Sequence, residues 1–64
     1  MTYSIFDAGN LVTSFDREDE AHEALERLAH ENAETCDGLL LVAFDDAGDV
    51  VADCIPGERI VTAA

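Results

Sequence analysis

Histidines, cysteines and clustered acids are the residues of this sequence that could carry chemistry, and the two histidines are the first candidates. His22 and His30 lie eight residues apart in a segment whose periodicity predicts a helix. In a helix they stand about 80° apart around the axis and about 12 Å apart along it, which is too far for one shared metal ion. The helical zinc motif needs a second histidine four residues after the first, and neither histidine has one. We therefore expect exposed helix histidines and no metal site.

Cys36 and Cys54 could form a disulfide or supply a nucleophile. Cys36 follows the end of the predicted helix, where the negative end of the helix dipole opposes formation of a thiolate. The strand register expected below separates the two cysteines by about 13 Å, whereas a disulfide requires Cα atoms within about 7 Å. The sequence predicts two free structural thiols, which are typical of a reducing cytoplasm.

The segment 45–49 places three aspartates around Ala47 and Gly48. Such acids could hold calcium, but the twelve-residue ligand spacing and closing glutamate of an EF-hand are missing. Because aspartate beside glycine is also what a tight turn requires, we predict a turn. The sequence has neither a nucleophile elbow nor a glycine-rich phosphate loop. We expect no catalytic residues, no metal and no cofactor, and keep a small metal-dependent enzyme as a third hypothesis.

Negative charge is the strongest property of the composition. Fifteen Asp and Glu side chains stand against three arginines and no lysine, for a formal net charge of −12. Such a charge repels nucleic acid and anionic membranes and attracts basic surfaces. We therefore expect no direct binding of nucleic acid or membrane, and a basic protein as the kind of partner. Adaptation of a whole proteome to salt or to a GC-rich genome also explains the bias, because molar salt shortens the Debye length to about 3 Å.

The densest charge falls on the predicted helix. Asp19, Glu23 and Glu26, and further along His30 and Glu34, form a row one helical turn apart, about 5.4 Å, which comes near the spacing of backbone phosphates. Such a row can mimic DNA, and it is equally what a solvated helix face shows in an acidic protein. The acids expected to contact a partner are Asp19, Glu20, Glu23, Glu26, Glu31 and Glu34.

A helix predicted over residues 17–34 positions these acids. Apolar side chains recur at i, i+3, i+4, i+7 and i+8 from Ala21, as in a helix with one buried stripe. Acids crowd the first turn, where they favour the positive end of the helix dipole. Gly38 marks the exit from the helix.

Two β-hairpins are predicted, one on each side of the helix. Residues 6–12 and 44–51 both place Ala-Gly-Asx between apolar flanks, and glycine, asparagine and aspartate tolerate the positive φ of tight turns. The order is β-β-α-β-β. Placing the third strand beside the first gives a four-stranded antiparallel sheet in the order 2-1-3-4, with one helix packed on one face, an α+β fold. We expect a single domain over residues 1–64, with residues 56–64 as a C-terminal extension.

The register of the second hairpin decides which sheet face meets the helix. With residues 46–48 as a three-residue loop, one face is wholly apolar, and we expect the helix to cover it: Leu40, Val42, Phe44, Val50, Ala52 and Cys54. The opposite face then carries an apolar dimer patch: Leu39, Leu41, Ala43 and Val51. An uncovered patch of this kind predicts a homodimer or a docked partner. The C-terminal extension, with Ile60 and Val61, is the alternative cover.

The sequence resembles a group of short, acidic, uncharacterised prokaryotic proteins. The resemblance rests on Gly9-Asn10-Leu11, Phe15-Asp16, Glu20-Ala21, the turn from Asp45 to Gly48, and Gly57-Glu58. It spans most of the chain and implies no activity. More distantly, strand pairs followed by an acidic Glu-Ala-rich helix are similar to HicB-like antitoxin domains. Those domains neutralise a small basic ribonuclease toxin and often dimerise. This chain departs from them because it lacks a third strand before the helix and a DNA-binding extension.

These observations favour a non-enzymatic protein-interaction module over an enzyme. Its acidic helix would bind a basic protein, most concretely as an antitoxin-like neutraliser or regulator, and a DNA mimic that inhibits a nucleic-acid-binding protein is the alternative. The start of the sequence lacks the basic and long apolar parts of a signal peptide. No stretch approaches the roughly 18 apolar residues of a membrane span. We therefore expect a cytoplasmic protein.

Overall fold

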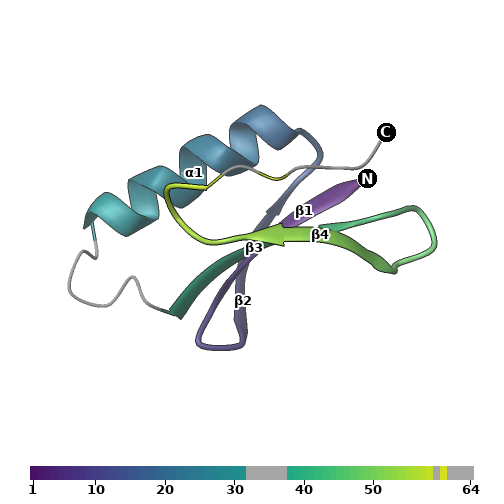
Figure 1. Cartoon of the computed structure of the whole chain (residues 1–64), viewed down its shortest axis with the longest axis horizontal. Coiled ribbons are helices and arrows are strands. Elements are labelled where there is room, and N and C mark those ends of the chain that lie inside the picture. The colour runs from purple at the N-terminus through teal and green to yellow at the C-terminus, as the bar shows by residue number, and fades with distance from the viewer. Residues whose placement is uncertain (32–37, 59, 61–64) are drawn as a thin grey trace.

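The computed structural model describes residues 1–31, 38–58 and 60. In chain order its elements are β1 (Thr2–Asp7), β2 (Asn10–Phe15), α1 (Glu18–Glu31), β3 (Leu39–Phe44) and β4 (Val50–Cys54). The strands form one antiparallel sheet in the order β2-β1-β3-β4, and α1 lies across one side of it (Figure 1). The predicted α+β fold and its strand order are confirmed. Residues 32–34, the end of the predicted helix, lie outside the described residues.

The stripe of α1 that faces the sheet is small and apolar. Ala21 and Leu25 are fully buried, and Ala24, Leu28 and Ala29 pack against the same core. Three acids occupy the first turn, where they stabilise the positive end of the helix dipole. With 14 residues and many charges, α1 cannot cross a membrane, and the described residues contain no other helix that could.

The first hairpin turns through Ala8 and Gly9. Both have positive φ, 52° and 86°, as in the type I′ turns that suit the twist of paired strands. The Ala8 amide also donates to the Gly38 carbonyl at 2.9 Å, which ties this turn to the start of β3. A Cβ on Gly38 would lie 2.8 Å from Asp7 Oδ1 and 3.0 Å from the Ala8 nitrogen, so this close approach requires glycine.

The second hairpin has the predicted three-residue loop. The Asp45 amide donates to the Asp49 carbonyl at 2.9 Å, and the Gly48 amide donates to the Asp45 carbonyl at 3.0 Å. Asp45 Oδ1 accepts the amides of Ala47 and Asp49 at 3.0 and 2.9 Å. The Asp45 side chain is therefore used to close the turn, as the turn chemistry of aspartate predicts.

The predicted register is right at the end of this hairpin and wrong beyond it. Phe44 pairs with Val50 as expected, but the register shifts by one residue between Ala43 and Phe44, so that Ala43 pairs with Ala52. One extra residue sends the remaining side chains to the other face. An equivalent shift lies between Ile5 and Phe6 in the first hairpin, so the sequence repeat extends to the bulges.

The bulge in β4 reverses the predicted assignment of the sheet faces. Leu39, Leu41 and Ala43 are buried in the core with α1, and Leu40, Val42 and Phe44 are not part of that core. The core also holds Ile5 and Cys54. Ile5, Leu25 and Leu41 are its largest fully buried side chains, and the burial of each contributes about 1.5–3 kcal/mol.

The C-terminal segment covers the same sheet face as α1. Ile60 is 6% exposed and belongs to the core, and residues 55–58 run beside α1 in Figure 1. The alternative expectation, that the extension covers Leu39, Leu41 and Ala43, agrees with the place of Ile60 in the same core, although α1 lies on that face as well. Val61 lies outside the described residues. The helix and this segment together shield β1, β3 and β4 on one side.

We predict that Ala8→Asn stabilises the fold by about 1 kcal/mol. An L-residue in the left-handed region costs about 1–2 kcal/mol, and asparagine tolerates that region better, as the Asn-Gly preference of type I′ turns shows. Urea denaturation measures the change. The control is Ala47→Asn in the other hairpin, because Ala47 does not have positive φ and should change little. Equal effects at the two sites would contradict this explanation.

Candidate functional site

An acidic groove runs between α1 and the segment that follows β4. Its volume is about 590 Å³. Four carboxylates, one imidazole and one glycine line it: Asp19, His22, Glu23, Glu26, Gly57 and Glu58. Three of these acids, Asp19, Glu23 and Glu26, belong to the predicted partner-binding set. Helical periodicity places them on one side of α1, because residues three and four apart are neighbours on a helix surface.

Glu58 is the acid of the groove that the sequence-based prediction missed. It is held by a tight turn, in which the Glu58 amide donates to the Ile55 carbonyl at 3.1 Å and Gly57 has φ 89°. Proline followed by glycine at the two central positions is the signature of a type II turn. Pro56-Gly57 could therefore have predicted the turn, but not the element against which it packs.

The turn is attached to the helix by two contacts of α1 side chains with backbone amides. Glu26 Oε1 accepts the Gly57 amide at 2.9 Å, and His22 Nε2 accepts the Ile60 amide at 3.3 Å. Glu26 therefore has a structural contact in addition to its place in the groove. These two hydrogen bonds hold the C-terminal segment, which forms one wall of the groove, against α1, which forms the other.

His22 is 5% exposed, so the prediction of an exposed histidine is wrong at this position; His30 is exposed, as expected. The Ile60 amide comes from 38 residues along the chain, and no local pattern around His22 announces it. While Nε2 accepts that N–H it carries no proton, so it cannot donate to Glu18 Oε1, 3.7 Å away. The imidazole therefore serves as a hydrogen-bond acceptor in the lining of the groove.

Arg17 precedes α1 and Arg27 lies on its outer side, and each is engaged by a nearby acid. Arg17 binds Asp19 through Nε at 3.2 Å and Nη2 at 3.5 Å, and Arg27 Nη2 binds Glu23 Oε1 at 3.0 Å. The hydrogen bond from Arg17 lowers the pKa of Asp19 below its ordinary value. Both pairs are exposed, and exposed ion pairs are weak and screened by salt, so an incoming cation can displace either arginine.

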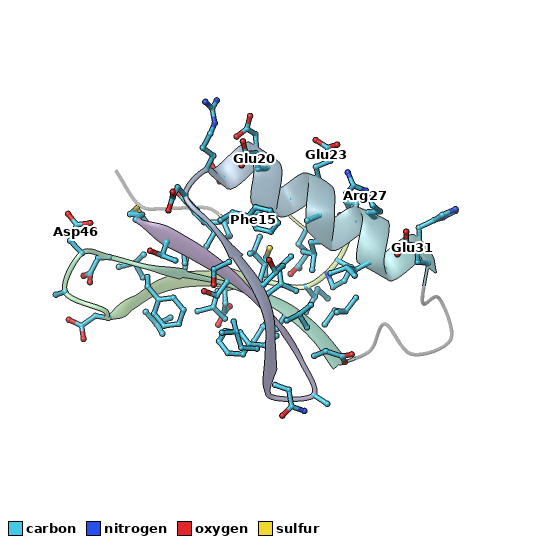
Figure 2. The ribbon with its side chains drawn as sticks, turned by 180° about the vertical axis from the view of Figure 1, so that it is seen from behind. Phe15, Glu20, Glu23, Arg27, Glu31 and Asp46 are labelled. Atoms are coloured by element: carbon cyan, nitrogen blue, oxygen red, sulfur yellow. The ribbon has the colours of Figure 1, made fainter. Side chains whose placement is uncertain are left out.

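The other predicted acids of α1 lie outside the groove. Glu20 and Glu31 are exposed, and Figure 2 shows them with Glu23 and Arg27 on the outer side of α1, whereas Phe15 lies between the helix and the sheet. Glu20, Glu23 and Arg27 also border a smaller hollow of about 210 Å³ beside Phe15. Glu34 lies outside the described residues. The structure therefore brings three of the six predicted acids together.

The predicted dimer patch is not a surface. Leu39 is 5% exposed, and Leu41 and Ala43 are fully buried beneath α1, which corrects their assignment to an open face. Val51, the fourth member, is 45% exposed at the bulge of β4. The error comes from the one-residue register shift. It places Ala52 and Cys54 of β4 on the same face as Ala43 and Leu41 of β3.

Cys54 is a free thiol within the core. Burial raises the pKa of this thiol, and the carboxylates of Glu58, Asp53 and Glu26 raise it further. A thiol in such surroundings stays protonated and unreactive, which agrees with the predicted structural role. Cys36 lies outside the described residues, so its predicted free state stays a prediction.

The lining of the groove is predominantly anionic, with four carboxylates. Among residues 1–31, 38–58 and 60 no group of three or more His, Cys, Asp or Glu side chains is arranged to hold a metal ion. The open shape and four carboxylates suit a guanidinium or ammonium group, because carboxylates form charge-assisted hydrogen bonds with both. Comparison of the chain with models of protein families, with curated proteins and with solved structures finds no match.

We predict that His22→Phe destabilises the protein by about 1–3 kcal/mol, because it leaves the buried Ile60 amide without an acceptor. His22→Gln should cost less, since its amide oxygen can still accept. His30→Phe is the matched control on the exposed side and should change stability by less than about 0.5 kcal/mol. Urea denaturation and hydrogen exchange at the Ile60 amide are the measurements. Unchanged protection of that amide in His22→Phe would contradict the assigned bond.

Proposed function

We propose that this chain is a non-enzymatic protein-interaction module that binds a basic protein through the acidic groove and the outer side of α1. The observation that carries the proposal is the groove itself. Two of its four carboxylates, those of Asp19 and Glu23, form exposed contacts with arginines that are weak enough to exchange. A partner arginine or lysine entering the groove would replace them and gain the remaining acids.

The groove is preorganised for this task. Glu26 and His22 hold the second wall in place through the Gly57 and Ile60 amides, so binding need not order a loose segment. Preorganised contacts lose less free energy to ordering than flexible ones. The net charge of −12 adds long-range attraction, which accelerates encounter with a basic surface more than it tightens the complex.

An antitoxin-like neutraliser or regulator in the cytoplasm is the most concrete form of this proposal. A small basic toxin has the charge that the groove and the outer side of α1 require. The free thiol of Cys54 supports a reducing compartment. The alternative of a DNA mimic has less support, because the Gly57 amide engages Glu26, which interrupts the row of free carboxylates.

Affinity capture with two charge-matched variants tests the proposal. The groove variant is Asp19→Asn with Glu23→Gln, and the control is Asp46→Asn with Asp49→Asn at the tip of the β3–β4 hairpin, far from α1 in Figure 2. Each removes two charges. The first capture is at about 0.1 M salt, where the Debye length is about 10 Å. Wild type and control should then retain a basic protein, and the groove variant should retain several-fold less of it. The protein should be lost at about 1 M salt.

Three outcomes would count against the groove. Equal capture by the two variants would mean that net charge alone attracts the partner. Capture that does not weaken with salt would exclude an electrostatic contact. Competition between the chain and duplex DNA for one site on the captured protein would support the DNA-mimic alternative instead.

A further inference from the structure

The side of the sheet opposite α1 carries a second surface, which we call the helix-free face. Side chains alternate along a strand, and directly paired residues share a face. The pairs Phe6 with Leu11 and Leu40, and Phe44 with Thr2 and Val50, therefore lie on this face. Its apolar members are Phe6, Leu11, Leu40, Val42, Phe44 and Val50.

The helix-free face is largely apolar and its ends are exposed, whereas Val42 in its middle row is 7% exposed. Leu11 and Val50 are 61% and 59% exposed, and Phe6, Leu40 and Phe44 are half-buried. In the part of the chain that the structure describes, no helix or strand lies on this side of the sheet (Figure 1). A sheet that is apolar on both faces normally has both covered, so half of the layered arrangement is missing.

One row across the helix-free face contains two serines and ends in an aspartate. The hydroxyls of Ser4 and Ser14 lie 3.0 Å apart and share a hydrogen bond, and Ser4 pairs with Val42, which pairs with Asp53. Each serine hydroxyl is therefore the hydrogen-bond partner of the other. Asp53 is exposed on the edge strand β4, and no ion pair involving it is found among the described residues. An occupant of this face must therefore complement one carboxylate at the side of an apolar surface.

The described residues of a second copy do not supply that complement. The arginines of the described residues, Arg17 and Arg27, are engaged on the α1 side of the sheet. In a symmetric pair through the helix-free face, no arginine of the described residues would lie beside Asp53, and burying an unpaired charge is costly. Each copy also carries a net charge of −12, which opposes self-association.

The size and edges of the sheet favour one helix over an added strand. Four strands about 4.8 Å apart and five residues long present about 300 Å², less than half of the roughly 800 Å² that each partner gives to a standard interface. A single helix, about 10 Å wide, matches that area. Both edge strands carry a bulge, and bulges disrupt the ladder that an added strand would need.

We propose that the helix-free face binds one amphipathic helix of a partner protein. The apolar stripe of that helix packs on Phe6, Leu40 and Phe44, and a flanking arginine or lysine lies beside Asp53. The pairing is charge-complementary, whereas two copies of the chain would each bring a net charge of −12. This surface and the acidic groove lie on opposite sides of the sheet, so either can bind when the other does not.

The test uses a synthetic helical peptide of about 14 residues, about 21 Å long, with leucines on one stripe and arginines flanking it. Fluorescence anisotropy measures its binding, and amide shifts in β3 and β4 locate it. Asp53→Asn should weaken binding about three- to fivefold and Val50→Gln about tenfold. The matched controls, Asp16→Asn and Ile55→Gln, remove one charge and one exposed apolar side chain elsewhere and should change binding less than twofold.

A peptide of the same composition with its stripe scrambled separates shape from charge. The proposal expects it to bind at least tenfold more weakly than the amphipathic peptide. Equal binding of the two peptides, or equal loss in Asp53→Asn and Asp16→Asn, would overturn the proposal in favour of general attraction. A homodimer in sedimentation that Val50→Gln dissociates would overturn it in favour of a second copy of the chain.

Discussion

The structure depends on the placement of β3, whose six residues are all apolar. This strand lies between β1 and β4, and its side chains alternate between the two faces of the sheet. Leu39, Leu41 and Ala43 form the floor on which α1 packs, while Leu40, Val42 and Phe44 form the centre of the helix-free face. One short strand therefore serves both faces. The bulge next to Phe44 sets which side chains of β4 join each face.

Charge and burial are separated in space by this arrangement. The acids of α1 occupy its outer side and the groove, and the sheet-facing stripe of α1 is alanine and leucine. The groove exists because the C-terminal segment returns to α1 and buries Ile60 against it. The same contact that completes the core therefore builds the second wall of the proposed binding site, and stability and binding are linked through His22 and Glu26. A partner that binds in the groove should also stabilise the contact of the C-terminal segment with α1.

The sequence predicted the features that depend on local chemistry. The two hairpins follow from Ala-Gly-Asx turns, the helix from its apolar period, and the strand order from the handedness of the crossover. The errors share one cause, which is dependence on distant residues. The extra residue of β4 moved Ala52 and Cys54 to the face of Leu41 and Ala43 and Asp53 to the face of Val42, so the face expected to be wholly apolar was not, and the expected dimer patch is core. His22 is buried by a segment 38 residues away, and Glu58 joins the groove by the same long-range contact.

The most direct test compares the free energies of unfolding of Leu41→Ala and Leu40→Ala. Both variants remove the same atoms from adjacent positions of one strand, so strand propensity cancels. Leu41 is fully buried under α1, and its truncation should cost about 2–5 kcal/mol. Leu40 is half-buried on the helix-free face, and its truncation should cost about 1 kcal/mol. A larger loss in Leu40→Ala than in Leu41→Ala would contradict the assignment of the two faces, and with it the surface proposed to bind a partner.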